Sequence, residues 1–251
     1  LEQTDMVILS HPAFVSEAER LAEAHRTKSG LKVTVVTPET VYNEFSSGTP
    51  DATAYRRFMK MFYDRASSDA DAPKYLLLFG DGAYDNRMIT NDWNKLTSLN
   101  LLLTYQSQES LNMYAYVTDD YFGFLDDSEG SSLSSDKLDI GIGRFPVRTV
   151  AEAATAVNKS ISYMENKTAG AWKNNITFVA DDGDTNLHMN QANQLAGSIE
   201  TNHPEFLVNK IYFDAYKKDY SGGKVGYPDV TTKIQKELKN GQMVINYTGH
   251  G

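Results

Sequence analysis

Apolar residues along the chain follow two patterns, short continuous runs and longer stretches with helical spacing. Runs of about four to eight apolar residues predict buried β-strands, and they lie at 6–9, 31–36, 73–79, 175–180, 207–213 and 243–247. Stretches with one apolar stripe predict amphipathic helices, at 14–29, 38–45, 53–66, 147–167, 186–201 and 229–239. Strands therefore alternate with helices, which is typical of parallel sheets covered by helices on both faces.

Residues that start and stop helices support these assignments. Gly30 stands where a C-cap glycine is expected after the first helix. Thr149 and Glu152 have the spacing of a capping box at the start of the helix at 147–167. The pair Asn240-Gly241 predicts a turn before the last strand.

The strand–helix–strand–helix–strand order occurs twice, so we predict an α/β protein with two adjacent parallel-sheet units and flanking helices. The first unit is expected at 1–145 and the second at 146–251. Residues 83–112 lack a clear period and predict a loop with one further strand at 101–105.

Two predicted strands of the second unit end in polar residues. Asp181 and Asp182 follow the strand at 175–180, and His250 follows the strand at 243–247 between two glycines. Ligands of open α/β sheets bind at the carboxyl ends of strands, and a carboxylate beside an imidazole suits acid–base chemistry. Two other interpretations stay open: His250 as an ordinary turn residue, and Asp181, Asp182 and Asp184 as caps of the next helix.

Composition excludes several classes of protein. With 24 Lys and Arg against 33 Asp and Glu, the formal net charge is −9, which argues against binding nucleic acid or anionic membranes. No apolar run approaches the roughly 20 residues that span a bilayer. The chain has no cysteine, so it holds no disulfide, zinc–thiolate site or cysteine nucleophile of its own. It starts without Met or a signal peptide, so we expect Leu1 to be a processed or artificial boundary.

An acidic stretch runs from 119 to 139. It holds Asp119, Asp120, Asp126, Asp127, Glu129, Asp136 and Asp139. Calcium takes several oxygen ligands at once, so Asp119, Asp120, Asp126 and Asp127 are candidate ligands of a structural Ca²⁺. The spacing fits no EF-hand, and a solvated loop is the alternative. No other cofactor is expected, and the absence of a phosphate-binding glycine motif disfavours a nucleotide-binding enzyme.

Several segments resemble the gingipain-type cysteine peptidases. The last five residues, YTGHG after an apolar strand, resemble the family's catalytic-histidine segment. Residues 142–145, IGRF, with the helix around 161–165, resemble the junction between its two subdomains. Residues 178–183, FVADDG, resemble the strand that carries the acidic partner of the histidine. Segments 78–85 and 118–123 are most similar to the branch that includes the sortase of the type IX secretion system.

This resemblance implies a caspase-like catalytic subdomain, of which the second unit is the front part. His250 would be the general acid and base, and the Gly251 amide would contribute to an oxyanion hole. Asp181 would orient the histidine, where the family usually has a Glu that is one methylene longer. The nucleophilic Cys would lie beyond Gly251, in the remainder of the same protein, so this chain alone should be inactive.

For the whole protein the resemblance implies a sortase at the bacterial cell surface or outer membrane, or outside the cell. It would cleave C-terminal signals of type IX secreted cargo and pass the acyl group to an amine, with outer-membrane secretion components as further partners. The region 186–190 has no acidic residue where the family's specificity for basic side chains resides, so that specificity is not expected. The alternative is a catalytically inactive module that keeps the fold to bind another protein.

Overall fold

A computed structural model describes residues 1–87, 89, 101–106, 117–132, 135–221 and 226–250. The chain forms two compact units, Leu1–Asn166 and Lys167–Gly251. The sequence suggested a boundary before helix α4 (Val150–Glu165). In the structure the boundary lies after this helix, because α4 packs against α1 (Val15–Ala24) of the first unit.

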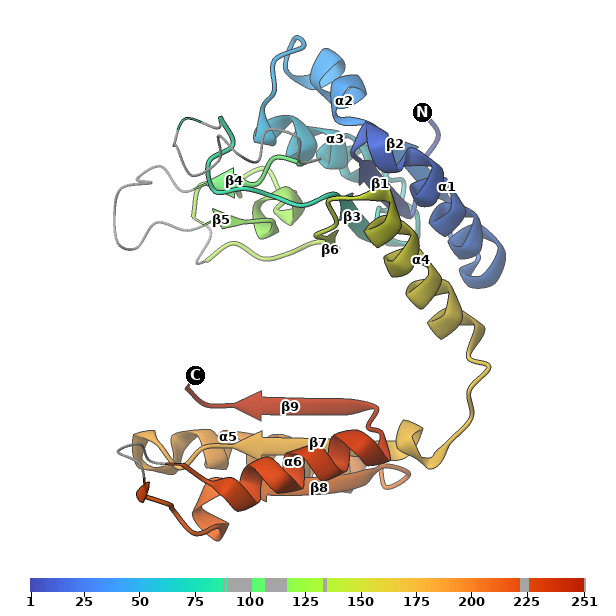
Figure 1. Cartoon of the computed structure of the whole chain (residues 1–251). Helices are drawn as coiled ribbons and strands as arrows, with labels where there is room; N and C mark the ends of the chain where they lie inside the picture. Colours follow the sequence, from blue (N-terminus) through green and yellow to red (C-terminus); the bar gives the residue numbers. More distant parts are fainter. Residues whose placement is uncertain (88, 90–100, 107–116, 133–134, 222–225, 251) are drawn as a thin grey trace. The chain divides into compact units, whose positions relative to one another are not determined.

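The first unit is built on a four-stranded parallel sheet in the order β2-β1-β3-β6 (Figure 1). Its strands are β1 (Met6–Ser10), β2 (Val33–Val36), β3 (Tyr75–Phe79) and β6 (Gly141–Phe145). Besides α1 and α4, its helices are α2 (Pro38–Phe45) and α3 (Ala52–Arg65). A separate antiparallel pair joins β4 (Tyr105–Gln106) to β5 (Val117–Thr118).

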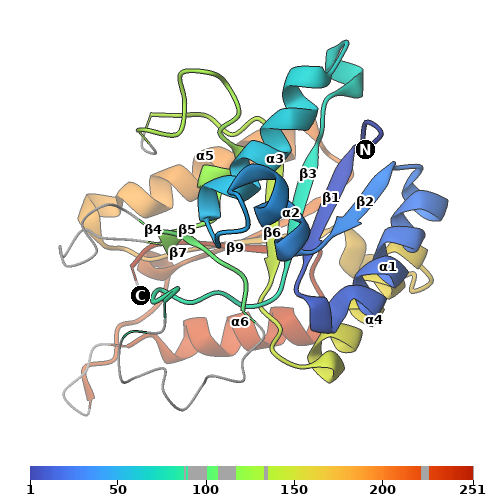
Figure 2. The same ribbon diagram turned by 90° about the horizontal axis from the view of Figure 1, so that it is seen from above.

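Alternate residues of the central strands supply two cores, one on each face of this sheet. Val7 and Leu9 of β1 pack with α2 and α3, whereas Ile8 packs with α1 and α4. This division follows from the period of two along a strand. Figure 2 shows the two helix pairs on opposite faces of the sheet. Because both faces are covered, the strands read as continuous apolar runs in the sequence.

The second unit has the predicted strand–helix–strand–helix–strand order. Strands β7 (Asn175–Ala180), β8 (Leu207–Tyr212) and β9 (Val244–Thr248) form a parallel sheet in the order β8-β7-β9. Helix α5 (Leu187–Asn202) packs on one face and α6 (Pro228–Asn240) on the other. Strand β7 is therefore central, and its apolar residues are buried.

The helix boundaries follow the predicted signals. Thr149 and Glu152 form both hydrogen bonds of a capping box at α4. Gly30 is left-handed at the end of a π-helical turn, His25–Ser29, that continues α1. Gly241 follows α6 with a positive φ of 83°, a conformation that favours glycine.

The two helices expected between β2 and β3 are present as α2 and α3, so the first unit is not a simple repeat of the second. Two expectations are corrected. The strand expected at 101–105 forms only at β4, two residues long. The last strand was predicted to be buried, but β9 pairs only with β7 within the described residues, and its Val244 and Tyr247 are 43% and 46% exposed.

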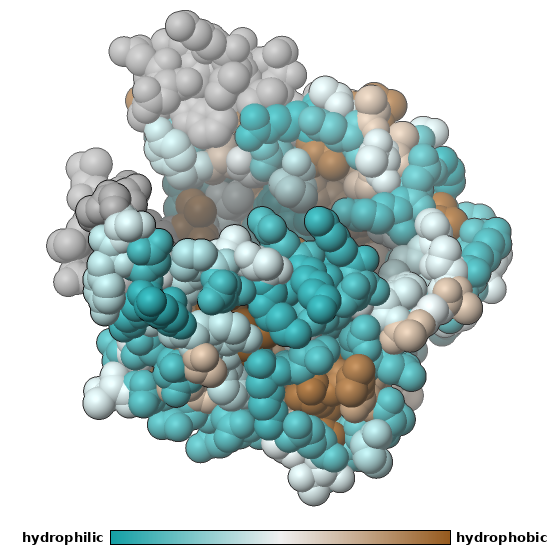
Figure 3. Space-filling model, turned by 60° about the horizontal axis from the view of Figure 1, so that its bottom comes forward, coloured by the Kyte–Doolittle hydropathy of each residue, from teal (hydrophilic) through white to brown (hydrophobic). Residues whose placement is uncertain are grey.

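No helix in the described part of the chain is long and apolar enough to cross a membrane. The face drawn in Figure 3 is mostly hydrophilic, with hydrophobic residues in small patches. Among the described residues, Glu237 is the one buried acidic side chain, whereas the apolar runs fill the sheet cores.

Candidate active site

The carboxyl ends of β7 and β9 lie side by side in the second unit. The two strands are parallel neighbours, with Ala180 of β7 opposite Thr248 of β9. This register places the acidic segment that follows β7 next to the Gly249-His250 segment that follows β9. The topology therefore brings Asp181 and His250 together at one sheet edge, although they are far apart in the sequence.

The carboxylate of Asp181 is the central acceptor of this edge. Its Oδ2 accepts the backbone N–H of His250 at 2.8 Å, and its Oδ1 accepts the backbone N–H of Gly183 at 3.2 Å. The Nδ1 of His188, on the first turn of α5, lies 2.6 Å from the same Oδ1. The hydrogen bond from the His250 backbone is the main cause that lowers the pKa of Asp181. An ionised carboxylate only accepts, so His188 Nδ1 carries the donated proton.

The imidazole of His250 pairs with Asp184 rather than with Asp181. Its Nε2 lies 2.7 Å from Oδ2 of Asp184, and this hydrogen bond raises the pKa of His250. The same oxygen lies 3.6 Å from Nε2 of His188. The two imidazole rings meet edge to face, with centroids 4.9 Å apart and planes at 75°. Asp181 thus fixes the main chain at His250, and Asp184 accepts from its side chain.

The loop that carries Asp184 has an unusual backbone. Asp184, Thr185 and Asn186 are all left-handed, with φ of 50°, 57° and 65°. Asp and Asn tolerate this conformation, but a β-branched Thr is a true outlier there. Such residues cost about 1–3 kcal/mol each and cluster at functional sites. In this protein the strained loop holds the Asp184 carboxylate on the His250 imidazole.

Gly249 leaves room for this arrangement. A Cβ at this position would lie 2.5 Å from Asp181 Oδ2 and 2.6 Å from the Tyr247 hydroxyl oxygen. The Tyr247 hydroxyl donates to the carbonyl of His250 and so ties the chain end back to β9. A glycine before His250 is therefore required by the close approach of the Asp181 carboxylate.

The helix-cap interpretation of the acidic residues does not hold. The N-cap residue of α5 is Asn186, and its side chain makes no capping hydrogen bond. Asp182 instead forms an ion pair with Lys218, with Oδ2 and Nζ 2.6 Å apart. The pKa of Asp182 is lowered, chiefly by this contact. Asp181 and Asp184 face imidazoles, so the three carboxylates have different partners.

Sequence reasoning missed His188 and gave Asp184 only a capping role. Asp184 precedes α5 in the left-handed loop, so helical spacing gives no signal for its approach to His188. The available signal was His188 itself, a titratable residue seven positions after Asp181. Gly251, the candidate oxyanion-hole residue, lies outside the described residues.

The four candidate calcium ligands are not gathered in one place. Asp119 pairs with Arg144 at 2.7 Å, and Asp127 pairs with Lys60 at 2.8 Å. Among the described residues, Asp126 instead lies near Glu129 and Asp139, with one oxygen from each within 4.8 Å of the others. Asp120 begins a short 3₁₀ helix. Calcium binding to the acidic stretch stays a prediction.

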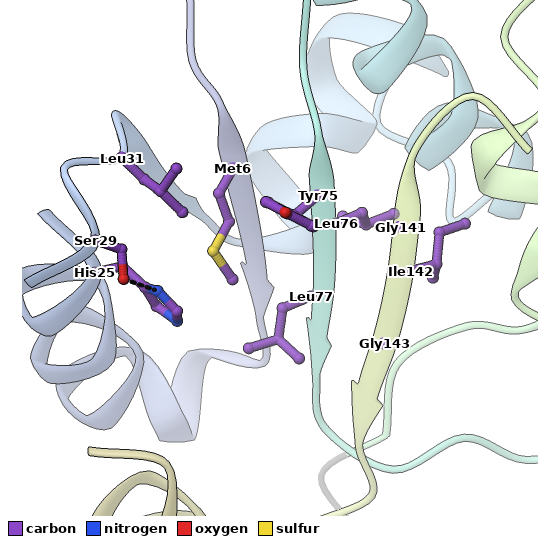
Figure 4. A pocket seen from close by; sticks show the side chains of 10 residues that line it. All are labelled: Met6, His25, Ser29, Leu31, Tyr75, Leu76, Leu77, Gly141, Ile142 and Gly143. Atoms are coloured by element: carbon purple, nitrogen blue, oxygen red, sulfur yellow. Dashed lines mark hydrogen bonds between the residues drawn. The ribbon is translucent and has the colours of Figure 1, made fainter. Parts of the chain in front are cut away.

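A pocket in the first unit has different chemistry. It is lined mainly by apolar and glycine residues of β1, β3 and β6 (Figure 4). Its one imidazole, His25, contacts the Ser29 hydroxyl at 3.4 Å, and burial lowers the His25 pKa. No carboxylate is among its lining residues. The acid–base groups therefore lie at the β7–β9 edge rather than in this pocket.

The class of protein follows from a family comparison. The model of peptidase family C25 matches residues 1–251, so the chain belongs to this family of cysteine peptidases. The chain itself has no cysteine.

A solved structure is similar to a large part of the chain. It is the crystal structure of dimeric latent PorU from Porphyromonas gingivalis, with 49% identity and a TM-score of 0.63. The match covers 69% of this chain and 17% of that one. The curated proteins compared include no match. The predicted α/β class, with a partial caspase-like subdomain, is confirmed by this similarity and by the two parallel sheets.

Proposed function

We propose that this chain is the front part of the catalytic region of a cysteine endopeptidase in which His250 is the general acid and base. The observation that carries the proposal is the His250 imidazole, 2.7 Å from a carboxylate at the end of a parallel strand, in a chain of family C25. An imidazole with a carboxylate partner stabilises the imidazolium that forms during acyl transfer. Asp181 is the orienting residue, because it holds the main chain at His250 and the neighbouring imidazole.

The thiol would come from the part of the protein that follows His250. Strand β9 supports this arrangement, since β7 is its only strand neighbour within the described residues and its other edge can pair with a further strand. A further strand added there would place its own carboxyl end at the same edge. Gly251 would then offer its amide to the oxyanion.

The reaction proposed for the whole protein is transfer of an acyl group from secreted cargo to an amine. The thiolate attacks the scissile carbonyl, and His250 gives a proton to the leaving amine as the C–N bond breaks. An acceptor amine then attacks the thioester, loses its proton to the histidine and releases the thiolate. The resemblance of residues 78–85 and 118–123 to the sortase branch of the family supports a sortase of this kind. It would act on C-terminal signals of type IX cargo at the cell surface, with outer-membrane secretion components as partners.

The test is the exchange of His250 for Ala in the full-length protein. Cargo processing should fall by about 10²–10⁴, the usual contribution of a general acid–base group. His203→Ala is the matched control, because His203 is an exposed histidine whose Nδ1 lies 3.4 Å from Glu205. Normal processing by His250→Ala, with the His203 variant also active, would remove the catalytic role.

The second candidate is an inactive module that binds another protein. The absence of cysteine from these 251 residues favours it. A full-length protein that shows no thiol-dependent cleavage, and whose His250→Ala variant binds its partner unchanged, would establish this alternative. Inhibition of processing by a thiol-alkylating reagent would exclude it.

A further inference from the structure

We propose that His188, His250 and Asp184 form a binding site for Zn²⁺ or a similar divalent transition metal. One ligand atom from each residue lies within 4.8 Å of the other two. A tetrahedral zinc with bonds of about 2.0–2.2 Å spaces its ligands about 3.4 Å apart. The Asp184 oxygen already lies 2.7 Å from His250 Nε2 and 3.6 Å from His188 Nε2, so side-chain rotations of small extent complete the triangle.

The donor set selects the metal. Two imidazoles and one carboxylate suit zinc and its neighbours, whereas calcium and magnesium prefer oxygen ligands alone. Three protein ligands leave a fourth position for a water or a substrate group. The acidic stretch around Asp126, which offers only oxygens, would not compete for the same ion.

Asp181 is the observation that points to His188 as a ligand independently of the cluster. Metal-binding histidines usually donate their second ring nitrogen to a carboxylate, which fixes the tautomer and the ring plane. Asp181 holds His188 in this way, with Oδ1 2.6 Å from Nδ1, so the other nitrogen faces the cluster. His188 is only 13% exposed and is fixed by α5, whereas His250 is 73% exposed and can adjust. His188 is therefore a fixed ligand, and His250 can rotate to complete the coordination of an ion.

The consequence concerns regulation, and it rests on the proposed function of His250. A metal on Nε2 replaces the proton that His250 shares with Asp184, and that proton is released to water. A neutral imidazole has one nitrogen with a free lone pair. When a metal takes that lone pair at Nε2, Nδ1 keeps its proton, so His250 can no longer accept a proton at either nitrogen and the enzyme would be inactive. Chelation would restore it without a change in the chain.

The test is calorimetric titration of the full-length protein with Zn²⁺ alone, followed by titration of variants. His188→Ala and Asp184→Asn should each weaken binding by about 100-fold or more, because each removes a ligand. Asp181→Asn should weaken it by about 10–100-fold, the usual loss with an outer-sphere carboxylate. His203→Ala should leave binding unchanged.

Cobalt provides a second measurement that does not depend on activity. The Co²⁺ form should give tetrahedral d–d bands without a thiolate charge-transfer band, since the ligands are nitrogen and oxygen. Zinc affinity that is unchanged in both His188→Ala and Asp184→Asn would overturn the site, as would a Co²⁺ spectrum dominated by thiolate. Asp184→Asn keeps the test decisive if the more buried His188 variant does not fold. If the unchanged protein binds no Zn²⁺ and His250→Ala still loses processing, the proposed function stands and only the metal site is removed.

Discussion

Each unit carries polar residues at the carboxyl ends of its parallel strands, but the partners of these residues differ between the two units. In the first unit, carboxylates near the strand ends pair with arginines: Asp119 takes two hydrogen bonds from Arg144, at 2.7 and 2.8 Å, and Asp81 pairs with Arg148. In the second unit, the carboxylates after β7 pair with imidazoles, Asp181 with His188 and Asp184 with His250. The architecture is shared, but the basic partners differ.

The basic partner decides what each edge can do. We call the strand ends of the first unit, with Arg144 and Arg148, the structural edge, and the ends of β7 and β9 the chemical edge. A guanidinium stays charged at all accessible pH values and fixes two strand ends by bidentate contacts. An imidazole exchanges its proton near neutral pH and can therefore take part in a reaction. Exposure does not follow this division, since each edge has one buried and one exposed basic partner: Arg144 and Arg148 are 12% and 48% exposed, and His188 and His250 are 13% and 73% exposed.

The largest expected effect is that of Asp181→Asn on the activity of the full-length protein. The amide keeps the shape but removes the negative charge that holds His188 Nδ1 and the His250 N–H. We expect kcat/KM to fall by about 10²–10⁴, as for other groups that orient a catalytic histidine. Steady-state kinetics on a cargo peptide measures it.

Asp81→Asn is the matched control at the structural edge. Asp81 also follows a strand and also accepts the N–H of its own loop, from Gly82 at 2.8 Å. Its partner is an arginine, so kcat/KM should stay within about twofold of the unchanged protein, because an ion pair with an exposed arginine contributes little. An equal fall in kcat/KM in Asp181→Asn and Asp81→Asn would show that the two edges do not differ in function.

The next effect, on stability, belongs to the first unit. Arg144→Ala leaves the Asp119 carboxylate without its bidentate partner and also removes donors to the carbonyls of Gly80 and Leu103. The free energy of unfolding should fall by about 2–3 kcal/mol, less than the 3–5 of a fully buried pair because both side chains keep some exposure. Urea denaturation measures it. Arg148→Ala should lose about 1 kcal/mol or less, since Arg148 is 48% exposed.

A smaller effect is expected from a single methyl group at the second edge. In Gly249→Ala the new Cβ lies 2.5 Å from the Asp181 carboxylate and 2.6 Å from the Tyr247 hydroxyl, so both groups must move. We expect a loss of about 1–3 kcal/mol in the free energy of unfolding, typical of overpacking. Gly197→Ala in α5 is the control, because nothing lies within 4 Å of its added Cβ, and it should gain about 0.4–1 kcal/mol. Similar stabilities for the two variants would mean that Gly249 has no packing role.

Much of the fold could be predicted because local signals and packing agree. The capping box at Thr149, the C-cap at Gly30 and the buried run of β7 each depend on residues close in sequence. The unit boundary and the exposure of β9 could not be predicted, because both depend on which elements meet in space. An apolar strand reads alike in the middle and at the edge of a sheet.

The site was predicted only in part, because it too depends on which elements meet in space. Parallel neighbours bring Asp181 and His250 together, and strand order alone suggests that contact. The choice of Asp184 as the partner of the imidazole depends on three left-handed residues in a short loop. Asp, Thr and Asn give only a weak signal of that conformation. His188 was hidden because a histidine in a helix more often serves packing than chemistry.

The last prediction uses pH to separate the two edges. The contact with Asp184 raises the pKa of His250 above 6.5, so the protonated form is favoured in the folded protein. A raised pKa gives a stabilising contribution that is complete below the unfolded value and is lost as pH rises through the folded one. In Asp184→Asn this contribution disappears, and the pKa of His250 should return toward 6.5, as followed by the imidazole proton shifts in NMR. His25 of the first unit, whose pKa is lowered by burial, makes no contact with Asp184 and should keep the same pKa in both proteins. A His250 pKa that is the same in both proteins would show that Asp184 does not hold the imidazole in solution.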